Sequence, residues 1–453
     1  MSFLNSKHVV VLDIISLTPQ LLEDPELTPN IQKLLHKGQH AKVKPVFPAV
    51  TGSMQATYIT GEDPSEHGII ANGIPDLDYK EITMWNQTMI PMQGKKIWEK
   101  LKEQDPEATT SILFWQFSKL STADYVVTPA PIHLEDHTIL WCDSKPRDLY
   151  GKLREKLGEF ELSSFWGPLA SVKSSEWIAK AAVDVLEEYK PRLSLVYLPN
   201  MDYHSQRYGP DSEQARQAVR ELDRVVGEFV EDLEERNLIY DTELVILSEY
   251  AFRPVHRPIH INQILNENGY VAVKEVQDMD FIDLEMCCAF AMSDHQLAHV
   301  YISHEEDIPS VKALLEETPG VAEVWGEEEK KAHHIDHERA GELIAIAEPD
   351  SWFVYYWWLN NKRAPEYAYT VDIHRKPGYD PVELFVNPET KTIPLDTDKI
   401  GGSHGLPPRS EKDLVSLIVT NKDIDLPSQL EAKEVHDLLL RLSLQASGKS
   451  MQS

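Results

Sequence analysis

The sequence lacks features that define several large classes of protein. It contains 3 cysteines, at positions 142, 287 and 288, and an odd count with one adjacent pair does not predict a disulfide framework. No run of 18 apolar residues occurs, so no membrane-spanning helix is predicted. The opening stretch MSFLNSKHVVVLDII lacks the charged region, apolar block and cleavage site of a secretory signal. These absences predict a protein of the reducing cytoplasm.

Basic residues are scarce. The chain has 44 Lys and Arg against 74 Asp and Glu, which gives a formal net charge of −30 over 453 residues. This balance excludes a nucleic-acid polymer as a partner held by phosphate neutralisation. A small phosphorylated substrate stays compatible with it, because bound metal ions can outweigh the global field. The sequence contains no internal repeat, no low-complexity tract and no glycine-rich phosphate loop of the P-loop or dinucleotide type.

What the chain does contain is an alternation of short apolar runs with amphipathic helical patterns. Buried strands are predicted at 8–14, 111–117, 193–199 and 242–250, and helices at 28–38, 174–190 and 211–236. Such alternation is typical of an α/β protein with a mostly parallel central sheet and helices on both faces.

The pattern of predicted strands and helices changes after residue 270. A strand-like run, a helix ended by Pro-Gly and the run VAEVW predict a small inserted α+β domain over 272–340. Residues 341–348 are predicted to return to the main sheet, so that 1–271 and 341–445 form the core and 446–453 a disordered tail. The aromatic segment 352–369 fits either a wedge between layers or a surface that stacks on a substrate ring.

Polar side chains follow the predicted strands where a ligand of an open α/β sheet binds. Asp13 ends the first strand, Asp202 follows the strand at 193–199, Glu249 follows the strand at 242–247, and His404 lies in the late loop GGSHG. Three acids and a histidine on separate loops are what a site for a hard divalent cation needs.

Four segments carry a resemblance to a known family. FPAVTGSMQATYITGEDPSEHGIIANG (47–73) resembles the nucleophile segment of the nucleotide pyrophosphatase/phosphodiesterase branch of the alkaline phosphatase superfamily. PNMDYHSQRYGP, LSEY and GGSHG resemble its metal-binding loops, and the similarity spans roughly residues 8–270 and 340–410. The resemblance implies an alkaline-phosphatase-like fold and two divalent metal ions.

The resemblance also implies that Thr51 is the nucleophile, held by one metal at the start of a helix whose N-terminus helps to bind phosphate oxygens. A plainer interpretation is that Thr51 is an ordinary N-cap and that Gly52 eases the turn. The two roles are compatible.

The implied metal ligands depart from the family pattern. One ion would take Asp202, His404 and Gln206, where relatives have a histidine. The other would take Asp13, Thr51, Glu249 and Tyr250, where relatives have Asp and His at the last two positions. Met54-Gln55 replaces Asn-His in the nucleophile segment.

Two interpretations of these departures remain: a site rebuilt with other ligands, or a decayed site. Retention of all three acids favours a rebuilt site, because buried unpaired carboxylates are costly. Fewer imidazoles shift the expected metal from zinc toward manganese or magnesium.

Several side chains could complete a rebuilt site as substrate contacts or alternative ligands: Gln55, His204, His260, His374 and Lys376. His256, Asp294, His295 and His299 are further spare groups. We expect His374, in the turn-rich loop TVDIHRKPGYDPVELF, to lie within reach of metal or phosphate, and Lys376 to pair with a phosphate oxygen in place of the missing Asn donor at Met54.

The sequence therefore predicts a metal-dependent hydrolase of phosphodiester or nucleotide pyrophosphate bonds that works through a phospho-threonine intermediate. The alternatives are a phosphonate or phosphomonoester hydrolase or phosphomutase on the same fold, or a degenerate relative that only binds a ligand. The expected partner is a small phosphorylated molecule, and the pattern indicates no oligomeric state.

Overall fold

The structure is a computed structural model that describes residues 7–134 and 138–446. Residues 447–453 of the predicted disordered tail lie outside the described ranges. The first strand, β1 (His8–Ile14), is buried along its whole length, as its unbroken apolar run HVVVLDI predicts for the centre of a sheet covered on both faces.

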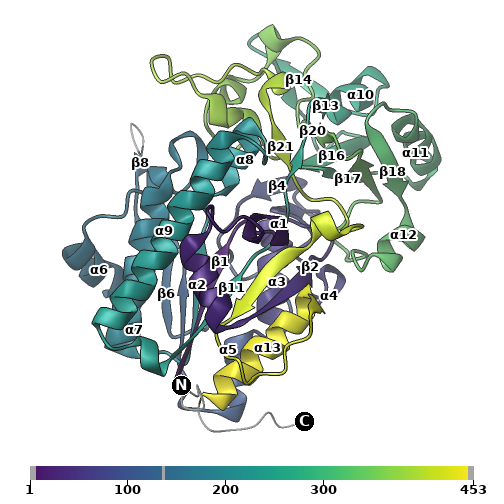
Figure 1. Ribbon diagram of the computed structural model, residues 1–453. Helices are drawn as coiled ribbons and strands as arrows, with labels where there is room; N and C mark the ends of the chain where they lie inside the picture. Colours follow the sequence, from purple (N-terminus) through teal and green to yellow (C-terminus); the bar gives the residue numbers. More distant parts are fainter. Residues whose placement is uncertain (1–6, 135–137, 447–453) are drawn as a thin grey trace.

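A nine-stranded sheet forms the larger part of the molecule (Figure 1). Its order is β23-β2-β22-β11-β1-β10-β5-β6-β9. The strand bounds in that order are Gln429–Glu431, Gln39–Lys44, Val415–Val419, Thr242–Leu247, His8–Ile14, Leu193–Leu198, Thr110–Leu113, Tyr125–Pro129 and Cys142–Lys145. The five central strands from β11 to β6 run parallel, whereas β22 and β9 are antiparallel to their neighbours. The predicted mostly parallel sheet is confirmed.

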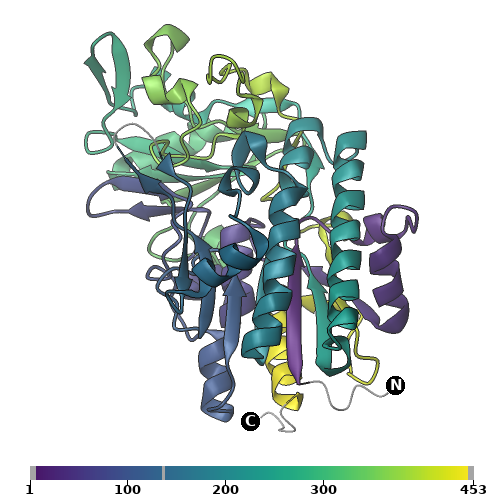
Figure 2. The ribbon, with the colours of Figure 1, turned by 90° about the vertical axis from the view of Figure 1, so that its left-hand side faces the viewer.

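Helices cover both faces of this sheet (Figures 1 and 2). On one face α9 packs against α7 and α2, and on the other α13 packs against α3 and α5. Their bounds are α2 (Pro29–Lys37), α3 (Thr51–Thr60), α5 (Ile97–Gln104), α7 (Val172–Tyr189), α9 (Glu213–Glu235) and α13 (Ala432–Gln445). Each helix that connects two parallel strands buries its apolar stripe on the sheet. Because β1, β10 and β11 run parallel, they end at the same edge.

A second, four-stranded antiparallel sheet sits beyond that edge, in the upper right of Figure 1. Its order is β16-β17-β19-β18, with bounds Ala289–Asp294, Leu297–Ile302, Leu343–Ala347 and Val321–Trp325. The prediction that 341–348 returns to the main sheet is wrong, because β19 pairs with β17 and β18 instead. An apolar run long enough for a buried strand does not show which sheet it joins.

The aromatic segment 352–369 supplies the core of this second lobe. Residues 352–358 are all buried and belong to a hydrophobic cluster separate from that of the main sheet. Residues 352–358 are therefore core residues and not an open stacking surface, whereas residues 359–362 of the same segment are exposed.

Short helices and two-stranded ribbons make up most of the remaining regular structure. The helices are α1 (Pro19–Leu22), α4 (Pro64–His67), α6 (Leu149–Leu157), α8 (Asp202–Tyr208), α10 (Ile261–Glu267), α11 (Ile308–Glu316) and α12 (Glu327–Ala332). The ribbons pair β3 (Gly73–Asp76) with β4 (Glu81–Met84), β7 (Ile132–His133) with β8 (Thr138–Ile139), β12 (Arg253–Pro254) with β21 (Gly402–Ser403), β13 (Arg257–Ile259) with β20 (Ser351–Phe353), and β14 (Val273–Val276) with β15 (Met279–Ile282).

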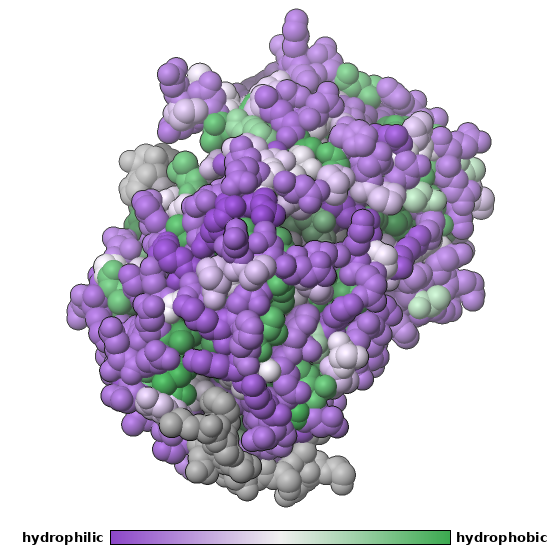
Figure 3. Space-filling model, in the orientation of Figure 1, coloured by the Kyte–Doolittle hydropathy of each residue, from purple (hydrophilic) through white to green (hydrophobic). Residues whose placement is uncertain are grey.

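The surface in the view of Figure 3 is mostly hydrophilic, with hydrophobic residues scattered in small groups. Across residues 7–134 and 138–446, no helix combines the length and apolar character needed to cross a membrane.

Candidate active site

Two carboxylates from neighbouring strands meet at the edge of the main sheet. Asp13 lies near the end of β1 and Glu249 lies two residues after β11, and both are completely buried. The side-chain amide of Gln55, on α3, donates to Asp13 Oδ2 at 3.2 Å and to Glu249 Oε1 at 2.6 Å. Gln55 is held in this orientation because its Oε1 accepts the backbone N–H of Gln116 at 2.7 Å. One amide thus bridges the two acids.

The bridge leaves one oxygen of each acid without a partner. Asp13 Oδ1 and Glu249 Oε2 are buried and accept no hydrogen bond from any described residue. Burial, and then the charge of Glu249, raises the pKa of Asp13, and burial raises the pKa of Glu249. Two buried carboxylates side by side need either a shared proton or a cation. The free oxygens, with the nearby hydroxyl of Thr51, fit one oxygen-liganded divalent ion.

Thr51 is the first residue of α3, and the residue in the N-cap position is Val50. The Thr51 hydroxyl makes no capping bond; it lies 3.1 Å from the Tyr250 hydroxyl and within hydrogen-bonding reach of Glu249. The plain N-cap interpretation of Thr51 is therefore wrong. The helix begins one residue earlier than the Thr-Gly pair suggested. The Thr51 side chain therefore points toward the carboxylates.

Asp202, the first residue of α8, lies on the other side of Thr51 and has both oxygens engaged. Its Oδ1 accepts the Tyr250 hydroxyl at 3.2 Å, and its Oδ2 accepts Gln206 Nε2 at 2.8 Å. Burial raises the pKa of Asp202 to about 7, although both hydrogen bonds oppose this shift. The two residues that replace the family's histidines thus act here as hydrogen-bond donors to Asp202.

His404 follows β21 and is buried against Tyr250. The two rings stack with centroids 3.7 Å apart and planes 3° from parallel. Because a carbonyl oxygen can only accept, the 2.9 Å contact between His404 Nδ1 and Ala49 O places a proton on Nδ1 and a lone pair on Nε2. Burial lowers the pKa of His404 to about 3, so the ring is neutral at physiological pH.

His, Cys, Asp and Glu side chains do not gather into a metal site in the described ranges. No group of three or more His, Cys, Asp or Glu side chains is arranged to hold a metal among residues 7–134 and 138–446. The oxygen site at Asp13 and Glu249 reaches three ligands only when the Thr51 hydroxyl is counted. Around Asp202, each carboxylate oxygen already accepts one hydrogen bond, from Tyr250 and from Gln206.

The second sheet reaches this site through the turn between β16 and β17. Its Asp294 accepts the backbone N–H of Asn72 at 2.7 Å and the Asn72 side-chain amide at 3.1 Å, and Asn72 Oδ1 accepts the N–H of Gly52 at 3.0 Å. The next residue, His295, has a φ of 61° and a ring 3.8 Å from that of His404. A left-handed φ at a buried non-glycine residue is strained and needs surrounding contacts to hold it.

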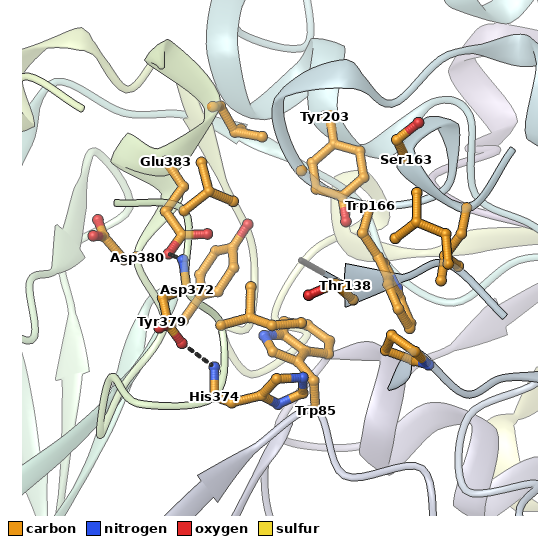
Figure 4. Close-up of a pocket in the computed structure, with 17 residues that line it drawn as sticks. Trp85, Thr138, Ser163, Trp166, Tyr203, Asp372, His374, Tyr379, Asp380 and Glu383 are labelled. Carbon is orange, nitrogen blue, oxygen red and sulfur yellow. Dashed lines mark hydrogen bonds between the residues drawn. The ribbon is translucent and has the colours of Figure 1, made fainter. Parts of the chain in front are cut away.

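A pocket of about 420 Å³ opens at Tyr203, the residue that follows Asp202 in the chain (Figure 4). Its walls come from distant parts of the chain, with Trp166 and Tyr203 facing Tyr379 across the opening and Trp85 at one end. Trp85 contacts the Tyr379 ring edge-on, with centroids 5.6 Å apart. None of the described residues that line the pocket is Lys or Arg.

The loop that the sequence singled out folds into one wall of this pocket. His374 is exposed and lines the pocket, and its backbone N–H donates to Asp372 Oδ1 at 3.2 Å (Figure 4). Lys376 is buried, and its Nζ donates to Thr370 O, Asp380 and Glu383 at 2.9, 2.8 and 2.6 Å. Because all three protons of Lys376 are engaged within the loop, it has none for the substrate phosphate that the sequence assigned to it.

His204 and His260 stand apart from the carboxylates. His204 is half-buried on α8, and burial lowers its pKa. His260 precedes α10, and its Nε2 lies 3.3 Å from Thr397 Oγ1. The contacts described for these two histidines do not include Asp13, Thr51, Asp202 or Glu249.

Tyr379 is a residue of the candidate site that the sequence reasoning missed. Its hydroxyl donates to Gln206 Oε1 at 2.5 Å, and its ring lies 4.2 Å from that of His295. It stands in the loop already singled out, between Lys376 and Asp380, but a search for metal ligands passes over a phenol. A search for donors to Gln206 would have considered it.

Comparisons with known proteins identify the family of this chain. Residues 9–380 match the family "Type I phosphodiesterase / nucleotide pyrophosphatase". An uncharacterised pyrophosphatase/phosphodiesterase of Schizosaccharomyces pombe is 24% identical over 255 residues, which cover 53% of this chain and 44% of that protein. A venom phosphodiesterase of Macrovipera lebetinus is 26% identical over 236 residues, which cover 51% of this chain and 23% of the venom protein. The chain spans less than half the length of both relatives.

Solved structures show the same fold. Murine ectonucleotide pyrophosphatase/phosphodiesterase 5, in an inactive threonine-to-alanine variant bound to AMP, aligns with a TM-score of 0.63 at 15% identity, covering 96% of this chain and 95% of that one. Phosphonoacetate hydrolase from Sinorhizobium meliloti, bound to phosphonoformate, aligns with a TM-score of 0.63 at 16% identity, covering 97% and 96%. With the family match over most of its length, the chain belongs to the type I phosphodiesterase / nucleotide pyrophosphatase family.

Proposed function

We propose that this protein hydrolyses a phosphodiester or nucleotide pyrophosphate bond by transferring the phosphoryl group to Thr51. The observation that carries the proposal is the pair of buried, partnerless oxygens, Asp13 Oδ1 and Glu249 Oε2, beside the Thr51 hydroxyl. The names of the relatives support phosphoester hydrolysis, and the murine neighbour is inactive when alanine replaces a threonine.

Asp13, Glu249 and Thr51 would hold one divalent cation. An all-oxygen ligand set favours magnesium or manganese over zinc. When bound, the cation would withdraw charge from phosphate and hydroxyl oxygens, which lowers the barrier to attack on phosphorus. In the first step, the Thr51 oxygen bonds to phosphorus and the alcohol oxygen of the substrate departs with the bonding electrons. In the second, water attacks the phospho-threonine and frees Thr51.

The aromatic pocket would hold the organic group of the substrate. Its volume of about 420 Å³ falls within the range of small-molecule sites, and its walls carry Trp85, Trp166, Tyr203 and Tyr379. The absence of Lys and Arg among the described lining residues disfavours a group that carries a further negative charge, such as the carboxylate of phosphonoacetate. This lining favours an ester over a carboxylated phosphonate.

The test compares wild type with Thr51→Ala on bis(p-nitrophenyl) phosphate in the presence of Mn²⁺. We expect Thr51→Ala to lower kcat by at least about a thousandfold, because the covalent route is lost. Acid-quenched wild-type protein should carry a p-nitrophenyl phosphoryl group on the peptide that contains Thr51, because one aryl ester stays on phosphorus, and mass spectrometry should detect this group in wild type and not in Thr51→Ala. If Thr51→Ala keeps more than about a tenth of the wild-type kcat, the proposed nucleophile is wrong.

A further inference from the structure

Four hydrogen bonds around Asp202 have directions that the chemistry of the donors fixes. Tyr379 donates its hydroxyl to Gln206 Oε1, so the amide of Gln206 must turn its Nε2 to Asp202 Oδ2. Tyr250 donates its hydroxyl to Asp202 Oδ1 at 3.2 Å. A phenol has one proton, so Tyr250 can only accept in its 3.1 Å contact with Thr51. When Thr51 donates in that contact, a line of hydrogen bonds runs from Thr51 through Tyr250 to Asp202.

Asp202 ends this chain as an acceptor whose two oxygens are both used. The resemblance to the family implies a second metal ion at Asp202, but here Tyr250 and Gln206 take the places of two of its histidines. The atom of Gln206 that could coordinate a cation is Oε1, and it accepts the Tyr379 hydroxyl at 2.5 Å, while the Tyr250 proton lies toward the carboxylate. These residues fit a network of hydrogen bonds and do not fit a second ion.

We propose that Tyr250 takes the place of the second ion as a catalytic residue that relays the proton of Thr51 to Asp202. The inference rests on the proposed function of Thr51. As the bond between Thr51 Oγ1 and phosphorus forms and the bond to the leaving oxygen breaks, the Thr51 proton passes to the Tyr250 oxygen. The Tyr250 proton passes to Asp202 Oδ1, and the leaving oxygen keeps the electron pair and takes a proton from water. In the second step the attacking water gives up a proton to solvent, and the relay runs backward as the bond between phosphorus and Thr51 breaks.

The Tyr250 ring is positioned independently of its hydroxyl. It is 2% exposed, stacks on His404 at 3.7 Å and meets the edge of Phe252 with centroids 5.8 Å apart. His404 is in turn fixed by its 2.9 Å bond to Ala49 O and by the His295 ring at 3.8 Å. A phenylalanine at position 250 would therefore keep the stack and lose only the hydroxyl.

Glu249 is the competing acceptor for the Thr51 proton, since it also lies within reach of the hydroxyl. A cation held on Asp13 and Glu249 would engage the Glu249 lone pairs and leave Tyr250 as the remaining acceptor. Cation binding therefore distinguishes the two residues. Glu249→Gln should abolish it, and Tyr250→Phe should not.

The experiment measures Mn²⁺ stoichiometry and affinity by isothermal titration calorimetry, and kcat and KM on bis(p-nitrophenyl) phosphate. For Tyr250→Phe we expect kcat to fall about 10²–10⁴-fold, the usual worth of acid–base assistance, with KM within roughly threefold and Mn²⁺ binding unchanged. Wild type should bind one Mn²⁺ per chain. The matched control is Tyr301→Phe, which removes a phenol hydroxyl that donates to Arg339 O at 3.0 Å in the second lobe, and it should keep wild-type kcat.

Asp202→Asn tests the other end of the relay in case Tyr250→Phe fails to fold, which circular dichroism would show. It should lower kcat by a similar factor, and the double variant should lose little more than either single variant, because both break one relay. Two outcomes overturn the inference: Tyr250→Phe retaining more than about a third of kcat, or two Mn²⁺ per wild-type chain of which Asp202→Asn or Tyr250→Phe loses one. If only the relay is wrong, Thr51→Ala is still inactive. If Thr51→Ala is active, the proposed function itself is wrong.

Discussion

Replacing the buried Lys376 by methionine should destabilise the protein substantially. Lys376 is 1% exposed, and it pairs with Asp380 at 2.8 Å and with Glu383 at 2.6 Å, whose side chains are 2% and 6% exposed. Methionine fills the space but leaves two buried carboxylates without their cation. Breaking a buried ion pair from one side costs about 3–5 kcal/mol, so we expect the free energy of unfolding to fall by that amount.

The assay is equilibrium unfolding in urea, followed by circular dichroism at pH 8 and at pH 5. Burial raises the pKa of Glu383 to about 7; the charge of Lys376 opposes this shift, and the charge of Asp380 adds to it. Without the ammonium this pKa rises further, so at pH 5 Glu383 of the variant is protonated and neutral, and the deficit should shrink. Lys433→Met is the matched control, because its 2.8 Å pair with Asp63 leaves the lysine side chain 46% exposed, and it should cost less than about 1 kcal/mol.

The same variant separates a structural role from the phosphate-binding role that the sequence suggested for Lys376. A phosphate ligand would raise KM with little loss of stability, whereas the buried triad predicts lost stability. If the free energy of unfolding of Lys376→Met lies within about 1 kcal/mol of the wild-type value while KM rises at least tenfold, the reasoning from burial is refuted.

Three further predictions follow from the site and its surroundings. Exhaustive treatment with EDTA should remove activity and lower the melting temperature, and Mn²⁺ or Mg²⁺ should restore both, since an ion that binds only the folded state stabilises it; an unchanged melting curve would count against the Asp13–Glu249 site. Trp85→Ala should raise KM for bis(p-nitrophenyl) phosphate more than it lowers kcat, because Trp85 lines the aromatic pocket and is not among the groups proposed to take part in the reaction, and an unchanged KM would place the aryl group elsewhere. Burial lowers the pKa of His299 from 6.5 to about 4, so its contribution to stability is present above pH 6.5 and is lost as the pH falls toward 4. His299→Gln, which can keep the bonds to Ile70 O and Gly341 N–H, should reduce this acid sensitivity in unfolding measured from pH 8 to pH 4.

The sequence predicted the parts of the site that depend on local pattern. Unbroken apolar runs placed β1, β10 and β11 side by side in a parallel sheet, so Asp13, Asp202 and Glu249 had to follow at one edge. The resemblance to the family added Thr51 and His404. These residues lie around one another as expected, although the ions they would hold stay a prediction.

The sequence could not predict which polar groups would face each other across that edge. Tyr379 meets Gln206 across 173 positions of the chain, and Gln55 meets Glu249 across 194. No periodicity records such a pairing, and a glutamine between two carboxylates looks in the sequence like a substrate contact. The partner strand of β19 was missed for a similar reason, because an apolar run shows that a strand is buried but not against what.

The link from Asp294 through Asn72 to Gly52 ties the second lobe to the nucleophile helix. Around the same turn, Gln296 N–H donates to His404 O at 3.0 Å and Phe353 N–H donates to His295 O at 2.8 Å. Swinging the lobes apart would break these buried bonds, and those to the Asp294 carboxylate are worth about 1.5–3 kcal/mol each. Substrate and product should therefore exchange through the mouth of the aromatic pocket while the lobes stay closed. Deleting the second lobe to shorten the protein would therefore remove contacts that hold the N-terminus of α3, where Thr51 lies.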